Sequence, residues 1–473
     1  MINKEAELYK DFLYKMLKNG GSLEPAHIVD LKSKCEEELE YIKENLEKYN
    51  LREIPIQSRT SVNPLKKCTM LPFAYRTEIV NQVVNYLLGT PIDYSYGEDT
   101  INIAINEFAR YNDLDLLNME TLKDCCASGC AYRLMYIDDE GLESCINLPS
   151  DSVITLNDKQ GIAKYAFYFY TELDETGEEE VAVCEFYDES NMYKYIGDDY
   201  SELAETEKHM FAFMPVINIY NNAEREPDFK LVEDLIDAVD EIMSNHQDEI
   251  LEFRNAYMVF SGGRLDKEAY DKIIQTGAFE VPIGADVKFL TKNMDVNAVN
   301  TQREVLTNNI YKLSNSIDME KFSDSSESGE SRKWKLILLE NRAKEKMALM
   351  KTFLKQMFKI YGTRSVIKGS DFMAHNINFQ FNRSLPTDER YLGESLNLYK
   401  DYVSTRTLLS RVPFIDDVDA EIKRLQEEAD MELRKDFLNN TITSDGHPVT
   451  NVNNKIKEKQ AELDNSTGNG GEV

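Results

Sequence analysis

The stretch from Leu231 to Tyr361 constrains the fold of this chain more than any other part of it. Apolar residues in its first section recur at intervals of three or four, or their sums, which places them on one face of a helix about 40 Å long. These residues are Leu231, Leu235, Val239, Ile242, Ile250, Phe253 and Tyr257. Similar spacing predicts a second helix over residues 299–317, with Val299, Leu306, Ile310, Leu313 and Ile317 on its apolar face. A third helix is predicted over residues 333–361.

The charges of the first and third helices are opposite. The first helix contains one base, Arg254, against the acids Glu233, Asp234, Asp237, Asp240, Glu241, Asp248, Glu249 and Glu252. The third contains Lys333, Lys335, Arg342, Lys344, Lys346, Lys351, Lys355 and Lys359 against Glu340 and Glu345. Between the second and third helices lies the acidic segment SDSSESGES, residues 323–331. Two interpretations remain open: a helical hairpin with a solvated loop, or a channel wall with an acidic loop at its rim. The basic face of the third helix could meet DNA or the acidic first helix.

The segments on either side predict an α+β body. Two helices are expected within residues 1–50, and whether they pack on the body is left open. Residues 50–225 contain a helix ended by Gly89, a hairpin turn at Asp139-Glu140-Gly141, and strands in which aromatic and polar residues alternate. The insert at residues 257–297 combines strands with a short helix and is too small to hold a core alone. Past the third helix we expect a return to strand, two more helices and a polar tail.

Composition excludes several classes of protein. The formal net charge is −31, from 85 acids against 54 bases, which is the opposite of a cationic nucleic-acid binder. An acidic surface along which DNA slides is still compatible with this charge. No uncharged apolar run approaches the roughly 18–20 residues of a membrane span, so no membrane partner is expected. The odd number of cysteines, 7 in total, favours a reducing compartment.

Catalytic and metal-binding patterns are absent from the sequence. The cluster Cys125, Cys126 and Cys130 has no CxxC pair and no histidine nearby, so we interpret these residues as small buried side chains. There is no phosphate-binding glycine loop, nucleotide-binding glycine motif, HExxH or GxSxG. We therefore expect no enzyme activity, no cofactor and no metal site. His246 is expected at a solvated or interface position, and Trp334 as a core or subunit-interface anchor.

Five segments, in this order along the chain, resemble the portal proteins of tailed bacteriophages with long non-contractile tails. They are VNQVVNYLLGTPIDY, CCASGCAYRLMYIDDEGLESCINLPSDSVI, MPVINIYNNAEREPDFKLVEDLIDAVDEIMS, FSDSSESGESRKWKLILLENRAKEK and STRTLLSRVPFIDDVDAEIKRL. The resemblance covers about residues 50–435. One departure is that Glu330, Ser331 and Arg332 stand where the family has small apolar residues, so this loop is more charged than the family pattern.

The resemblance implies an α+β subunit with an α/β wing, a two-helix stem, a small α/β clip and a helical crown. The implied parts are a wing with N-terminal helices at 1–230, stem helices at 231–256 and 299–318, a clip at 257–298, a tunnel loop at 319–332, a long helix and wing return at 333–385, a crown at 386–436 and a largely disordered tail at 437–473. The implied DNA-channel residues are Ser323, Asp324, Ser325, Ser326, Glu327, Ser328, Gly329, Glu330, Ser331, Arg332 and Lys333. The implied stem and subunit-interface residues are Leu235, Val239, Ile242, Ile250, Phe253, Leu306, Ile310, Leu313 and Trp334.

The same resemblance implies a structural role. Such a subunit forms a dodecameric ring at one capsid vertex of the virion, assembled in the host cytoplasm, through which double-stranded DNA is packaged and later ejected. The implied partners are other copies of the chain, the DNA, the terminase, a head-completion or adaptor protein, and the major capsid and scaffolding proteins. The alternatives are a non-catalytic helical scaffold and, less favoured by the sequence, a metal-dependent nuclease.

Overall fold

Helices and strands are mixed along the chain, which confirms the expected α+β class. The computed structural model describes residues 2–18, 23–60, 68–173, 177, 179–253, 257–261, 267, 284, 286–290, 296–319, 329–364, 372–383, 393, 396–400, 402–410, 412, 415, 418, 421–429 and 431. These residues fall into two units, 1–384 and 385–473, which are considered separately.

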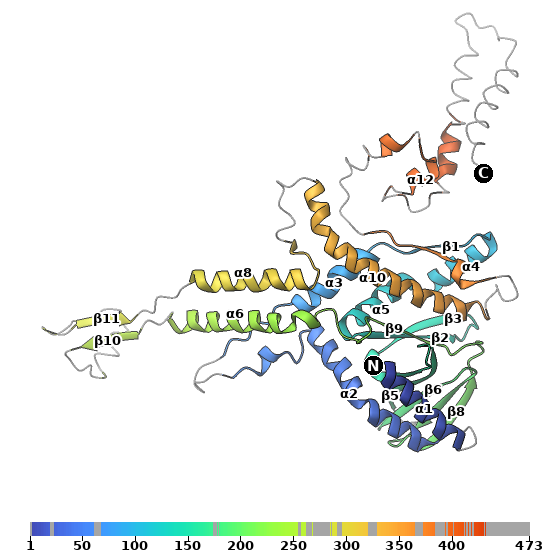
Figure 1. The fold of residues 1–473 in the computed structure, drawn as a ribbon, viewed down its shortest axis with the longest axis horizontal. Coiled ribbons are helices and arrows are strands. Elements are labelled where there is room, and N and C mark those ends of the chain that lie inside the picture. Colours follow the sequence, from blue (N-terminus) through green and yellow to red (C-terminus); the bar gives the residue numbers. More distant parts are fainter. Residues whose placement is uncertain are drawn as a thin grey trace, which may run out of the picture. The chain divides into compact units, whose positions relative to one another are not determined.

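Two antiparallel sheets form the body of the first unit (Figure 1). The three-stranded sheet has the order β3 (Glu143–Leu148), β2 (Cys130–Ile137), β9 (Val216–Tyr220). The five-stranded sheet has the order β4 (Val153–Asn157), β5 (Ala163–Leu173), β6 (Glu180–Tyr187), β7 (Asn191–Ile196), β8 (Glu202–Lys208). The β2–β3 turn confirms the predicted hairpin: the Asp138 carboxylate accepts from the backbone N–H groups of Glu140 and Leu142, and Gly141 has φ +81°.

A helical layer packs with the three-stranded sheet. It consists of α3 (Tyr75–Leu88), α4 (Asp99–Tyr111), α5 (Leu114–Ser128) and α10 (Gly329–Tyr361). Leu87 of α3, Met135 of β2, and Phe353 and Phe358 of α10 belong to one buried core. After α10 the chain adds β12 (Asn378–Gln380) antiparallel to β1 (Asp93–Ser95), with Phe379 opposite Tyr94. The segment after α10 therefore returns to the body as a strand.

The N-terminal helices pack on the five-stranded sheet. These are α1 (Ile2–Lys18) and α2 (Pro25–Tyr49), and they share a second core with β4, β5, β6 and β7. Phe12 of α1 meets Phe167 edge-on with ring centroids 5.5 Å apart, and both side chains are buried. The first fifty residues are thus part of the body, which the sequence alone left open.

The helices α6 (Glu233–Phe253) and α8 (Val296–Leu313) lie side by side (Figure 1). Beyond them, β10 (Tyr257–Ser261) and β11 (Asp286–Leu290) pair antiparallel, so the two helices also run in opposite directions. Most of the predicted insert, including its short helix, lies outside the described residues. Among the helices that the structure describes, none combines the length and the apolar character needed to cross a bilayer.

Three predicted helix boundaries were wrong. Tyr257, placed on the first helix, starts β10, because its aromatic and β-branched neighbours pair with Asp286–Leu290. Ile317 lies beyond the end of α8, since Asn315 takes a left-handed φ of +53° that no helix continues through. The third helix begins at Gly329 instead of Lys333.

The second unit contributes short helices to the described part of the chain. Helix α12 (Thr405–Leu409) begins after Ser404, whose Oγ accepts from the backbone N–H of Thr407. This bond caps the first turn of α12. Residues 396–399 and 421–429 are also helical, whereas the polar tail past residue 431 lies outside the described residues.

Candidate functional site: the α6–α8 pair and its base

The residues predicted to line the stem differ in burial within one chain. Val239 and Ile310 are buried, Leu235, Ile242 and Leu306 are half-buried, and Ile250 and Leu313 are 43% and 52% exposed. The side chains of Phe253 and Trp334 lie outside the described part. The exposed pair leaves apolar surface on both helices that this chain does not cover itself.

The apolar face of α6 is rotated from the one that the sequence predicted. Leu231 precedes α6 and is 82% exposed, whereas Val232 and Ile236 are fully buried. Val232, Ile236 and Val239 are spaced by four and three residues, so they form a stripe of their own. Sequence reasoning missed Ile236 because the stripe through Leu231 and Leu235 has an equally regular spacing.

A second stripe of α6 holds a segment from the same chain. We call Asp237, Asp240, Ser244 and Asp248 the polar ladder; their spacing is three, four and four. Asp240 Oδ1, Ser244 Oγ and Asp248 Oδ1 accept from the backbone N–H groups of Phe73, Leu71 and Thr69 at 3.0, 3.0 and 2.9 Å. Asp237 pairs with Arg76 at 2.5 Å and Asp248 with Arg59 at 2.8 Å. Part of the acidic face predicted for this helix is therefore used inside the subunit.

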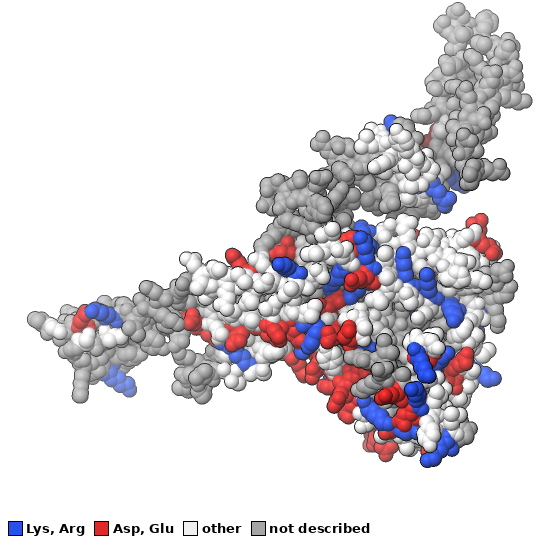
Figure 2. All heavy atoms as spheres, viewed as in Figure 1, with Lys and Arg blue, Asp and Glu red and all other residues white. Residues whose placement is uncertain are grey.

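Other acids remain on the surface. Asp234 and Glu241 of α6 are exposed, and Figure 2 shows acidic side chains along α6 and over the region of α2. In the same view the surface of α8 is mostly uncharged. The helix pair therefore presents one acidic helix and one nearly neutral helix.

Asp240 provides a pH-dependent test of the ladder. Burial raises the pKa of its carboxyl to about 6, and the nearby charge of Asp237 adds to this rise. The Phe73 N–H and Arg76 lower the pKa, but by less than burial raises it. An unfolded Asp titrates near about 4, so this raised pKa favours folding below pH 4, and the benefit is lost as the pH rises through 6. We expect Asp240→Asn to raise the free energy of unfolding at pH 7.5 by about 1–2 kcal/mol.

Denaturant titrations between pH 4 and pH 8 measure this effect. The gain from Asp240→Asn should shrink toward pH 4, where the wild-type carboxyl is also neutral. Asp234→Asn, an exposed acid on the same helix, is the matched control and should show no such pH dependence. A gain that is equal at both pH values would contradict the assignment.

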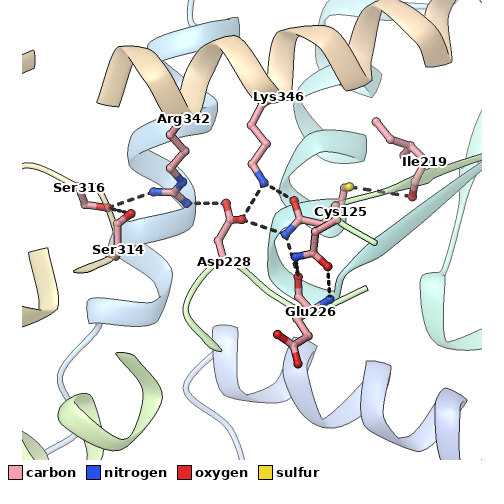
Figure 3. A network of polar contacts seen from close by, with 10 residues as sticks. Cys125, Ile219, Glu226, Asp228, Ser314, Ser316, Arg342 and Lys346 are labelled. Carbon is pink, nitrogen blue, oxygen red and sulfur yellow. Dashed lines mark hydrogen bonds and ion pairs between the residues drawn. The ribbon is translucent and has the colours of Figure 1, made fainter. Parts of the chain in front are cut away.

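A buried ion-pair cluster lies where the α6–α8 pair meets the body (Figure 3). Asp228, just before α6, binds Arg342 at 2.5 Å and Lys346 at 2.7 Å, both from α10. All three side chains are less than a tenth exposed. Lys346 also donates to the side-chain oxygen of Asn221, and Arg342 donates to Ser316 Oγ at 3.0 Å, beyond the end of α8. The cluster therefore joins the entry to α6, the exit from α8, and α10.

The charges in this cluster are balanced locally. Burial alone would raise the pKa of Asp228, but Arg342 and Lys346 outweigh it and hold the pKa of the carboxyl far below its usual range. Arg342 and Lys346 were assigned from sequence to a basic face of the third helix, and that assignment was wrong. Their spacing of four residues fits an internal pair on one helix face as well as it fits a surface.

The turn between α5 and β2 forms backbone hydrogen bonds with two residues of the cluster. The N–H of Asp228 donates to the Cys126 carbonyl at 2.8 Å, and the N–H of Asn221 donates to the Gly129 carbonyl at 2.9 Å. Cys126 and Cys130 are buried as predicted, and burial raises the pKa of each thiol to about 12. Within the described ranges, no group of three or more His, Cys, Asp or Glu side chains is arranged to hold a metal ion.

The predicted DNA-channel residues fall in two places. Residues 323–328 lie outside the described part. Residues 329–333 form the beginning of α10, so this section of the predicted loop is helical backbone.

Comparison with known proteins agrees with the resemblance seen in the sequence. Residues 30–435 match the family of phage portal proteins described as SPP1 Gp6-like. The chain is also 24% identical over 380 residues to the portal protein of Bacillus phage SPP1, an alignment that covers 75% of each chain. The match includes both sheets, the α6–α8 pair, α10 and the described helices of the second unit. The chain therefore belongs to the SPP1 Gp6-like family of phage portal proteins.

Proposed function

We propose that this chain forms a closed dodecameric ring at one vertex of a phage capsid and that double-stranded DNA passes through its central channel during packaging and ejection. The observation that carries the proposal is the family match across residues 30–435, which includes the α6–α8 pair. The exposed apolar residues Ile250 and Leu313 give each subunit surface for a neighbour to cover. The role is structural, without a catalytic step.

The charge distribution supports passage of DNA rather than tight binding. The chain carries a net charge of −31, and acids lie along the exposed surface of α6. Phosphates would be repelled from such a lining, so DNA would move without adhering to it.

The remaining partners follow from the parts of the subunit. The clip, residues 257–298, would dock the terminase during packaging and later the head-completion or adaptor protein. Its described strands β10 and β11 form only a two-stranded sheet, which is marginal by itself and would gain burial from neighbouring clips. The wing would meet the major capsid protein, assembly would involve the scaffolding protein, and the crown, residues 386–436, would lie inside the capsid.

Imaging of the purified chain tests the ring directly. Negative-stain images and native mass measurement should show closed rings. A stable monomer at assembly concentrations would contradict the proposal and favour a helical scaffold.

The predicted tunnel loop, residues 319–332, is proposed to contact DNA. Deleting residues 323–328, which leaves α10 whole, should preserve ring formation and reduce the yield of DNA-filled capsids to a small fraction of wild type. A Gly-Ser replacement of equal length separates the effect of loop length from that of the side chains. Normal yields of filled capsids from the deletion would refute a role for this segment in packaging.

A further inference from the structure

Helix α3 presents a polar stripe to α8 and α10. Glu78, Gln82 and Tyr86 are spaced by four residues and lie on one face of α3. The Glu78 carboxylate accepts from the hydroxyl of Tyr311, in the last turn of α8, at 3.0 Å to both oxygens. Burial and then Glu78 raise the pKa of Tyr311, so its hydroxyl keeps the proton that it donates.

At the far end of the stripe, α3 holds α10. The Tyr86 hydroxyl donates to Glu340 Oε2 at 2.7 Å. Arg383 donates two hydrogen bonds, of 2.9 and 3.1 Å, to the same carboxylate. Glu340, in the N-terminal half of α10, is thus fixed to α3 and to the segment that returns after α10.

Gln82, in the middle of the stripe, makes a two-way contact with the backbone of Ile317. Its Nε2 donates to the Ile317 carbonyl at 2.6 Å, and its Oε1 accepts from the Ile317 N–H at 2.7 Å. Ile317 lies beyond the end of α8, so neither backbone group has a helical partner there. The Gln82 side chain thus makes one donated and one accepted hydrogen bond with the Ile317 backbone, as the backbone of a paired β-strand would. A side-chain amide suits this position because it offers a neutral donor and a neutral acceptor side by side.

We propose that Gln82 is a positioning residue that fixes where the chain leaves α8 relative to α10. Ile317 and Glu340 lie on the two sides of residues 320–328, and α3 binds both through Gln82 and Tyr86. Arg342 adds a third link by donating to Ser316. The effect of Gln82 on DNA packaging rests on the proposed function, whereas its effect on the local backbone does not.

Hydrogen exchange on assembled wild-type and variant rings measures the local effect. Gln82→Leu keeps the size of the side chain and removes both hydrogen bonds, so the Ile317 amide should exchange about tenfold faster than in wild type. Asn85→Leu makes the same amide-to-aliphatic change at an exposed position of α3 and should leave exchange at Ile317 unchanged. Gln82→Leu should still form rings and should package less DNA than Asn85→Leu.

A pH series on Gln82→Glu separates positioning from simple packing. A protonated carboxyl has the same donor and acceptor as the amide, whereas a carboxylate offers two acceptors and repels the Ile317 carbonyl. The ratio of variant to wild-type exchange at Ile317 should therefore be high at pH 8 and should fall toward one as the pH is lowered to about 4, where a Glu carboxyl takes up its proton. The neighbouring charged groups Glu78, Asp318 and Arg342 are the same in both proteins, so wild type corrects for their titration.

Each outcome has a distinct meaning. Unchanged exchange at Ile317 in Gln82→Leu, or a flat pH series in Gln82→Glu, would overturn the inference, whatever the oligomeric state. Faster exchange with normal packaging would show that the contact holds the backbone at Ile317 without a role in packaging, which also overturns the inference. If wild type itself forms no rings and packages no DNA, the proposed function fails, and the exchange measurements on the single chain still test the contact.

Discussion

Replacing Asp228 with alanine is expected to lower the free energy of unfolding by about 3–5 kcal/mol. The change leaves the charges of Arg342 and Lys346 buried without a counter-ion. It also weakens the hydrogen bonds that these two side chains make with the segments that follow β9 and α8. Removing one partner of a buried ion pair costs far more than the pair contributes, because desolvation of the remaining charge is no longer offset. Chemical denaturation of wild type and variant measures the difference.

A triple variant isolates the charge effect from loss of packing. Asp228→Leu combined with Arg342→Met and Lys346→Met replaces the ions by apolar side chains and should recover most of the lost stability. The pKa of Asp228 is depressed, so the cluster stabilises the fold fully above pH 4 and loses this contribution only in stronger acid. A single Asp228→Ala variant as stable as wild type at pH 7 would show that the three side chains are hydrated rather than buried.

Gly129→Ala is expected to have a comparable effect through the backbone. Gly129 has φ +99°, and a Cβ built there would lie 2.0 Å from the carbonyl oxygen of Arg225 and 2.5 Å from its carbon. Both contacts are with backbone, so the loop behind Asp228 would have to move. We expect a loss of at least about 3 kcal/mol, or no soluble protein.

Gly141 provides the matched control for this substitution. Its φ is +81°, but a Cβ there would meet no atom within 4 Å. Gly141→Ala should therefore cost only the strain of a left-handed alanine, about 1 kcal/mol. Thermal unfolding of both variants compares the stability that each loses. Equal losses would show that the positive φ alone, without the close approach of Arg225, accounts for the need for glycine at position 129.

Local patterns in the sequence predicted the parts of the fold that depend on neighbours along the chain. The Asp138 turn and the end of α3 before Gly89 were both found where expected, because each depends on residues within a few positions. The buried Cys126 and Cys130 were also expected from their small size and apolar surroundings. The segments that resemble portal proteins identified the family.

Contacts between distant segments could not be predicted in this way. The polar ladder and the Asp228 ion pairs consist of ordinary polar and charged residues whose partners are more than a hundred positions away. A buried Lys346 and an exposed lysine look alike in one sequence, because helical spacing identifies a face without saying what covers it. The same limit explains why Leu231 was preferred to Ile236 on α6.

Because the Asp228 cluster is buried, added salt weakens its ion pairs much less than it weakens interactions between exposed charges. Dissolved ions screen exposed charges over about 8 Å at physiological salt, but they do not enter a cluster whose side chains are less than a tenth exposed. Repulsion among the exposed acids of α6 therefore weakens as salt is added, while the base that holds α6, α8 and α10 together keeps its strength. Added salt can therefore change the electrostatic repulsion along the α6–α8 pair while the ion pairs of the Asp228 cluster stay intact.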